Sequence, residues 1–206
     1  MKPYYQDKWV TIYHGDCREI LPTLEPVDLV LTDPPYGLNT KMQGGTWGIT
    51  YKHSDMIKWD YLCEAELLTQ IVNMAAVSII WGGNNYPLNP TRCWLIWDKI
   101  VRVPTLSDVE LAWTNMDKPS KIFSSLRMSC NGNKRHPTEK PIDLICWSIT
   151  QCNSEISVIL DPFLGSGTTC YCAKKLNHKS IGIEIEEKYC EIAAKRCMQT
   201  VMELGI

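Results

Sequence analysis

Residues 157–169 read SVILDPFLGSGTT, an apolar run followed by a glycine turn and two threonines. The first four residues predict a buried strand, and a helix is expected after the turn. The next predicted strand ends in Glu184, 19 residues after Gly165. Glycines let a backbone approach a ligand closely, and a helix N-terminus presents free N–H groups to it. A carboxylate at this spacing is typical of a contact with ribose hydroxyls. The stretch therefore predicts a nucleotide site in an α/β fold.

The glycine turn differs from two familiar nucleotide motifs. Cys170 stands where a dinucleotide fingerprint has its third glycine, and no G-x-x-x-x-G-K-[ST] occurs anywhere in the chain. An NTPase phosphate loop is therefore not expected, while a dinucleotide-dependent oxidoreductase stays open as an alternative. Phe163 is one of only two phenylalanines and directly precedes the turn. It is expected either in the core or against a cofactor.

Strands and helices alternate along the rest of the chain. We expect strands at 10–13, 28–32, 78–81, 93–97, 109–113, 157–160 and 180–184. We expect helices at 59–76, 142–152 and 189–201, and two further helices that end near residues 24 and 176. This alternation predicts an α/β fold with a Rossmann-like, mostly parallel sheet and helices on both faces. We expect the 206 residues to form a single domain, 1–206.

Composition excludes several classes of protein. Apolar residues make up 45% and charged residues 21% of the chain, as in ordinary globular proteins. No apolar run reaches 18 residues and the N-terminus has no apolar leader, so we expect an intracellular protein without a membrane span. The ten cysteines include no C-x-x-C pair, which favours reduced core thiols and no metal site. A net charge of −2 argues against a polycation that coats nucleic acid.

Two segments are candidates for contacts with a large partner. Residues 38–57 form a polar stretch with three glycines, which predicts a functional loop. Between residues 116 and 140 basic side chains outnumber acidic ones. The basic residues are Lys118, Lys121, Arg127, Lys134, Arg135 and Lys140, and the acidic ones are Asp117 and Glu139. A solvated surface stretch is the alternative interpretation.

Asp33-Pro34-Pro35-Tyr36 directly follows the strand 28–32. The Asp33 carboxylate and the Pro34 carbonyl are two acceptors that can bind both hydrogens of one exocyclic amino group. Such binding directs the nitrogen lone pair at an electrophile. Pro35 stiffens the turn, and Tyr36 offers a ring on which a base extruded from a duplex can stack, a contact worth roughly 1–3 kcal/mol. A plain Pro-Pro turn at a strand end is the alternative.

The two motifs together resemble the S-adenosylmethionine-dependent DNA amino-methyltransferases. D-P-P-Y precedes D-P-F-x-G-S-G-T-T, which resembles the circularly permuted order of the beta group of that family. The resemblance spans residues 12–197. Further matches are Gly15-Asp16, Ile96-Trp97-Asp98-Lys99, His136-Pro137-Thr138-Glu139-Lys140-Pro141, Gly182-Ile183-Glu184 and Tyr189.

The resemblance implies a role for each matched residue. Asp33 and the Pro34 carbonyl would hold the target amino group, and Tyr36 would stack on the flipped base. The implied contacts of S-adenosyl-L-methionine are Asp16 on the adenine, Glu184 on the ribose, Thr138 and Lys140 on the methionine carboxylate, and Asp161, Pro162, Phe163, Gly165, Ser166, Gly167, Thr168 and Thr169 beneath the methionine. Direct attack needs no covalent enzyme intermediate, so alignment would supply much of the rate.

The resemblance also implies a substrate, double-stranded DNA. D-P-P-Y favours N6 of adenine, with N4 of cytosine as the alternative, whereas N-P-P-Y would suggest a protein amide. Only 38–57 and about 116–135 remain to read DNA, which predicts a short recognition site or relaxed specificity. Lys118, Lys121, Arg127, Lys134 and Arg135 would contact phosphates.

The family resemblance implies a prokaryotic or phage origin, a cytoplasmic location and a link to restriction-modification. A homodimer, common in the family, would add DNA contacts. A non-catalytic DNA-binding protein with the same fold is the alternative from another functional class. All the proposed catalytic residues are present, which favours the enzyme.

Overall fold

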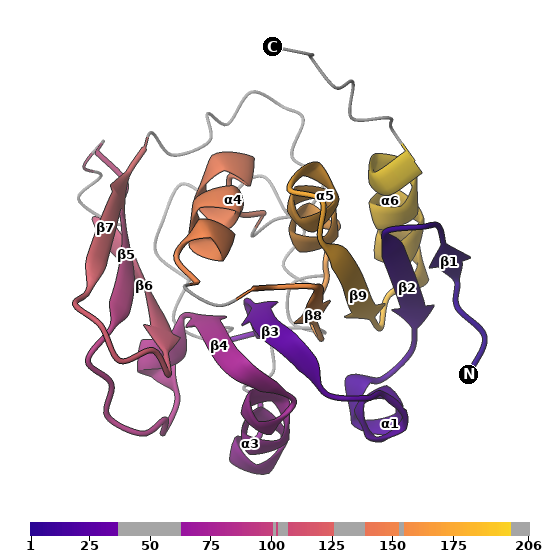
Figure 1. Ribbon diagram of the computed structural model, residues 1–206, viewed down its shortest axis with the longest axis horizontal. Helices are drawn as coiled ribbons and strands as arrows, with labels where there is room; N and C mark the ends of the chain where they lie inside the picture. The colour runs from indigo at the N-terminus through magenta and orange to yellow at the C-terminus, as the bar shows by residue number, and fades with distance from the viewer. Residues whose placement is uncertain (37–62, 101, 103–106, 126–138, 153–154, 199–206) are drawn as a thin grey trace, which may run out of the picture.

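The computed structural model describes residues 1–36, 63–100, 102, 107–125, 139–152 and 155–198. Within these ranges nine strands form one sheet in the order β1-β2-β9-β8-β3-β4-β6-β5-β7 (Figure 1). The strands are β1 (Tyr5–Gln6), β2 (Val10–His14), β3 (Val27–Thr32), β4 (Ala75–Trp81), β5 (Trp94–Asp98), β6 (Val109–Thr114), β7 (Lys121–Ser124), β8 (Val158–Asp161) and β9 (Lys179–Glu184).

Most of the sheet is parallel. β2, β9, β8, β3 and β4 are parallel neighbours, with Val10 beside Ser180 and Leu29 beside Ile159. β6 pairs antiparallel with both β4 and β5, while β7 lies parallel to β5. β1 is antiparallel to β2. The parallel strands therefore end at one common edge, called here the carboxyl edge, and begin at the opposite amino edge.

Helices cover both faces of the sheet (Figure 1). α1 (Cys17–Ile20) and α3 (Ala65–Asn73) lie on one face, and α4 (Ile142–Thr150), α5 (Thr168–Lys175) and α6 (Glu187–Met198) lie on the other. Short 3-10 turns follow α1 (η1, Leu21–Thr23) and β4 (η3, Gly83–Asn85). Successive side chains of a strand point to opposite faces. In β3, Leu29 and Leu31 pack with α4 and α5, and Val30 packs with α1 and α3. Burial on both faces explains why this strand is apolar throughout.

The observed fold confirms the predicted α/β class. The helix expected at 59–76 ends at Asn73, because β4 already begins at Ala75 and pairs with β3. The sequence reading missed β1 and β7. β7 is a four-residue edge strand with an exposed Ile122, so it lacks the apolar run that marks a buried strand. No helix in the described ranges is long and apolar enough to cross a membrane.

Candidate functional site

The carboxyl edge gathers four acidic residues from neighbouring strands. Asp16 follows β2, Glu184 ends β9, Asp161 ends β8 and Asp33 follows β3. These strands are adjacent and parallel, so their ends meet at one edge, where ligands bind in open α/β sheets. The structure therefore brings the predicted glycine loop and the D-P-P-Y segment to the same edge of the sheet.

A side-chain hydrogen bond joins the two motifs. The Thr32 hydroxyl, just before D-P-P-Y, donates to Asp161 Oδ1 over 2.7 Å. The Phe163 N–H donates to the same oxygen over 3.1 Å and turns the chain into the glycine loop. Burial raises the pKa of Asp161 to about 6, although hydrogen bonds from Thr169 and Thr32 oppose that shift. Asp161 is thus held by neutral donors and not by a cation in the described part of the chain.

Glu184 fixes the glycine loop from β9. Its Oε2 accepts the Gly165 N–H and its Oε1 accepts the Glu186 N–H, both over 2.8 Å. Burial raises the pKa of Glu184, while these two backbone donors lower it. A carboxylate oxygen has two lone pairs, so each oxygen keeps one acceptor position for a further donor.

The loop packs directly on α6 at Gly167. This residue precedes α5 with φ +83°, and a Cβ there would lie 2.7 Å from the Cβ of Ala193. Both the backbone angle and the short approach to α6 require glycine. The residues around it, Ser166, Thr168 and Thr169, are buried. Because α5 follows the carboxyl end of β8, its N-terminus lies at the carboxyl edge.

Arg196 of α6 connects the loop to the segment before Lys140. The guanidinium is buried; its Nη1 donates to Thr168 Oγ1 over 2.9 Å and to Glu139 Oε1 over 2.7 Å. The sequence reading did not find this residue. The sequence did contain a signal for it, since Arg196 lies on the apolar face of the last helix. A buried arginine is rare unless it is paired, so this position could have indicated an ion pair.

The D-P-P-Y loop rests on the segment after β4. The Tyr86 hydroxyl donates to the Pro35 carbonyl over 2.5 Å. Gly82 has φ +68°, and a Cβ there would overlap the Tyr36 ring. The Tyr36 hydroxyl donates to Asp33 Oδ1. Burial and the Asp33 carboxylate raise the pKa of Tyr36 well above its usual value, so the hydroxyl stays protonated as a donor.

Lys140 occupies the other oxygen of Asp33. Its Nζ lies 2.5 Å from Asp33 Oδ2, 3.4 Å from the Tyr36 hydroxyl and 3.2 Å from Glu110 Oε2. Burial alone would lower the pKa of this ammonium, but Asp33 and Glu110 raise it well above the usual value. The expected partner of Lys140 was a cofactor carboxylate, whereas the structure pairs it with Asp33. Thr138 lies outside the described residues.

Glu110 joins this cluster because β6 is antiparallel. The second residue of β6 therefore lies at the carboxyl edge, opposite Trp97 of β5. Lys99, just after β5, pairs with Glu110 Oε1 over 2.6 Å. Burial would raise the pKa of Glu110, but Lys140 and Lys99 lower it to about 2. Neither Lys99 nor Glu110 was given a role from the sequence. The signal was a single acid in the apolar run 109–113.

The two predicted phosphate contacts that the structure describes, Lys118 and Lys121, do not lie at this edge. Lys118 precedes β7 and donates to the Gln151 carbonyl at the end of α4, and Lys121 is the first residue of β7. Both lie at the amino edge, because β7 runs parallel to the central strands. Residues 121–124 of the second expected recognition loop form a strand. The remaining phosphate candidates, Arg127, Lys134 and Arg135, and the loop 38–57 fall outside the described residues.

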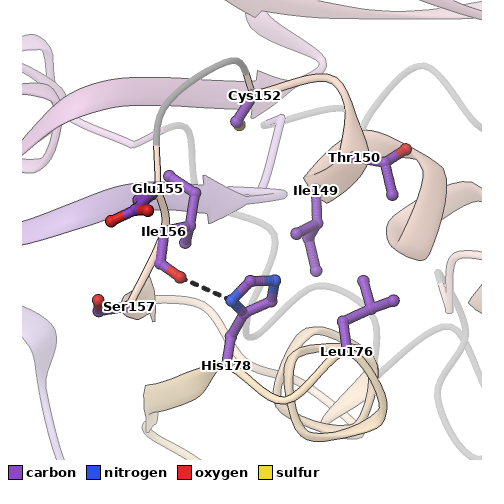
Figure 2. Close-up of a pocket in the computed structure, with 8 residues that line it drawn as sticks. All are labelled: Ile149, Thr150, Cys152, Glu155, Ile156, Ser157, Leu176 and His178. Carbon is purple, nitrogen blue, oxygen red and sulfur yellow. Dashed lines mark hydrogen bonds between the residues drawn. The ribbon is translucent and has the colours of Figure 1, made fainter.

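A cavity of about 490 Å³ also lies at the amino edge (Figure 2). The ends of α4 and α5 and the segment before β8 line it. His178 faces it, with Nδ1 2.7 Å from the Ile156 carbonyl oxygen. None of the site residues predicted from the sequence lines this cavity. The nine described cysteines are free thiols.

Known proteins match this chain over most of its length. A family model described as DNA methylase, of the N6/N4 type, matches residues 79–195, more than half of the chain. The putative methylase YubD of Escherichia coli (strain K12) is 38% identical over 219 residues, which cover 93% of this chain and 92% of that protein. Type II methyltransferase M.HinfI of Haemophilus influenzae is 28% identical over 253 residues, covering 95% of this chain and 70% of that protein.

Two solved structures share the fold. The M1.HpyAVI-SAM complex matches with a TM-score of 0.59 at 21% identity, over 91% of this chain and 98% of that one. The PvuII DNA methyltransferase (cytosine-N4-specific) matches with a TM-score of 0.67 at 17% identity, over 98% of this chain and 90% of that one. From the family model and the identity to YubD, the chain belongs to the N6/N4 family of DNA amino-methyltransferases.

Proposed function

We propose that this protein transfers the methyl group of S-adenosyl-L-methionine to the N6 amino group of adenine in double-stranded DNA. The observation that carries the proposal is the Thr32–Asp161 hydrogen bond, which holds the D-P-P-Y segment beside the glycine loop. An acceptor for an amino group and a site for a nucleotide cofactor thus share one edge of the sheet. Both are needed when a nitrogen attacks a methyl group directly.

The residues at the edge fit the cofactor. Gly167 lets the loop turn against α6, and Glu184 retains a free lone pair on each oxygen for the ribose hydroxyls. Asp16 caps α1 beside β9 and would contact the adenine. The segment 161–169 would lie beneath the methionine, with Thr138 toward its carboxylate. The bound cofactor supplies an electrophilic methyl group.

The chain's part in the reaction is to hold and align the target base. Asp33 and the Pro34 carbonyl accept the two amino hydrogens, and the Tyr36 ring stacks on the extruded base. Held in this way, the amino nitrogen would be directed at the methyl group that the cofactor supplies, and its surplus proton would leave to solvent. Asp33 acts as an acceptor and forms no covalent bond. Alignment at contact distance supplies much of the acceleration.

The choice of adenine rests on the aspartate of D-P-P-Y. The alternative target is N4 of cytosine. The structural likeness to the cytosine-N4-specific PvuII enzyme is the reason that the assay below also measures N4-methylcytosine. We also propose that the chain is one methyltransferase domain and that the segment near 38–57 and the part of 116–135 that follows β7 contact DNA.

A nucleoside assay tests the proposal. The protein is incubated with labelled cofactor and long unmethylated duplex DNA that contains all short sequence contexts, and the digested nucleosides are separated. We expect label in N6-methyladenosine. Label in N4-methylcytosine instead selects the alternative, and no labelled base, with cofactor binding intact, excludes both.

A further inference from the structure

Four charged groups form a row at the border of the site. Lys99 contacts Glu110 Oε1 at 2.6 Å, Glu110 Oε2 lies 3.2 Å from the Lys140 Nζ, and that Nζ lies 2.5 Å from Asp33 Oδ2. The two lysine side chains are only 6% and 8% exposed. The row links the antiparallel β5–β6 pair to the D-P-P-Y loop.

The Asp33 carboxylate is already engaged at both oxygens. The Tyr36 hydroxyl donates to Oδ1 and the Lys140 ammonium to Oδ2. Each of these donors covers one lone pair of the carboxylate. A target amino group that approaches Oδ2 therefore competes with the ammonium for that oxygen. Moving the ammonium away without a new acceptor would leave a buried, unpaired charge, which costs several kcal/mol.

Glu110 offers the ammonium a second acceptor. Its Oε2 is buried and receives no aligned hydrogen bond from any described residue, although the Lys140 Nζ is only 3.2 Å away. Lys99 holds the opposite oxygen, and the backbone of Glu110 belongs to a paired strand. The carboxylate is therefore fixed in place with one acceptor oxygen directed at the cluster.

We propose that Glu110 is a positioning residue that takes over the Lys140 ammonium when the target amino group replaces it on Asp33. Lys99 keeps Glu110 charged and in place during this exchange. The role rests on the proposed function, because the amino group of a base is what displaces the ammonium. Glu110 does not touch the base in this exchange; it acts through Lys140.

A double-mutant cycle between Glu110 and Lys140 tests the exchange. The variants E110Q, K140M and E110Q/K140M are compared with the wild type by single-turnover methyl transfer to long unmethylated duplex DNA. We expect E110Q to lower the rate at saturating DNA roughly 10- to 100-fold, as for loss of one partner of a buried charge pair. The KM for DNA stays unchanged, because the exchange follows DNA binding. In the K140M background the same substitution has almost no further effect.

Two further variants separate positioning from folding. K99M/E110Q removes both partners of the buried pair and so keeps the charge balance; we expect normal thermal stability with the rate still lowered. D108N removes an exposed carboxylate just before β6 and should leave the rate unchanged.

The outcomes distinguish this role from the proposed function. Equal rate losses for E110Q with and without Lys140, or full activity of K99M/E110Q, overturn the role of Glu110 in an otherwise active enzyme. Absence of any methylated base with the wild-type protein overturns the proposed function, and the role of Glu110 with it.

Discussion

Two pairs of neighbouring acidic residues at the carboxyl edge, Glu184 with Asp161 and Asp33 with Glu110, are held by different means. On the β9–β8 side, backbone N–H groups hold Glu184, and a backbone N–H group and hydroxyls hold Asp161. On the β3–β6 side, the Lys140 ammonium holds Asp33, and it shares Glu110 with Lys99. The first half contains the glycine loop, and the second contains the D-P-P-Y segment.

The different partners shift the pKa values of the buried carboxyl groups in opposite directions. Burial raises the pKa of Asp161 to about 6, since neutral donors only partly offset the loss of water. Glu110 is also removed from water, yet two ammonium groups lower its pKa to about 2. Asp161, in the half with the glycine loop, thus carries a charge without a cationic partner, whereas the carboxylates beside the D-P-P-Y segment have their charges fixed by ion pairs.

The largest expected effect comes from the acceptor itself. Asp33→Ala removes the carboxylate that would hold the target amino group, and we expect a loss of about a thousandfold or more in methyl transfer. Cofactor affinity should change little, because the glycine loop is untouched; calorimetric titration with S-adenosyl-L-methionine measures this. Equal losses of affinity and rate would show that the two halves are not separable.

The next effect concerns the contact between the glycine loop and α6. Gly167→Ala places a methyl group at φ +83° and 2.7 Å from the Cβ of Ala193. Backbone strain and overpacking together should lower the free energy of unfolding by roughly 3–4 kcal/mol. Urea denaturation measures the loss. Ala193→Gly in the same chain should recover only a small part of this loss, because the Cα of residue 193 still lies 2.8 Å from the new methyl group. Full recovery would contradict the backbone strain at φ +83°.

A third prediction uses the opposite pKa shifts of the two halves. The folded-state pKa of Asp161 lies above its usual 3.8, so its contribution to stability is present at low pH and is lost as pH rises through about 6. Between pH 4 and pH 7 the wild type should therefore lose roughly 2 kcal/mol of unfolding free energy relative to Asp161→Asn. Denaturation of both proteins at the two pH values gives this difference.

The pKa of Glu110 is shifted in the opposite direction to that of Asp161, so its effect on stability should have the opposite pH dependence. Its folded-state pKa lies below the usual 4.5, so its stabilisation is present above that value and is lost as pH falls toward 2. The stability difference between wild type and Glu110→Gln should be constant from pH 5 to pH 7. A slope of the same sign as for Asp161 would contradict the proposed distinction between neutral and ionic partners.

The smallest effect is expected at the amino edge. Lys118→Ala and Lys121→Ala remove charges that lie at the edge opposite to the site, so each should change methyl transfer less than about twofold. The salt dependence of DNA binding should also keep its slope, since a phosphate contact contributes about one unit to it. A reduced slope would restore these lysines as DNA contacts.

The sequence was sufficient for the parts of the site that depend on parallel strands. Asp33, Asp161 and Glu184 each stand at the end of a recognisable apolar strand, and parallel strands end at one edge. The direction of the strands is therefore enough to predict that these three residues lie close together, even when no side-chain contact is known. Their individual ligand contacts remain predictions.

The rest depended on contacts that local sequence does not encode. Glu110 reaches the site only because β6 is antiparallel, which periodicity cannot indicate. The basic residues 118 and 121 were grouped with the DNA contacts by charge alone, and charge does not say at which edge a segment lies. Arg196 pairs with Glu139, which lies 57 positions earlier in the sequence.

The pairing of β2 with β9 has a consequence for how the protein is made. Val10 of β2 is paired with Ser180, which a ribosome adds 170 positions later. At 5–20 residues per second, β2 waits roughly 10 to 30 seconds for this neighbour. During synthesis the nascent chain therefore exposes an incomplete apolar sheet, and transient cover by a chaperone would benefit this protein more than one built from local hairpins.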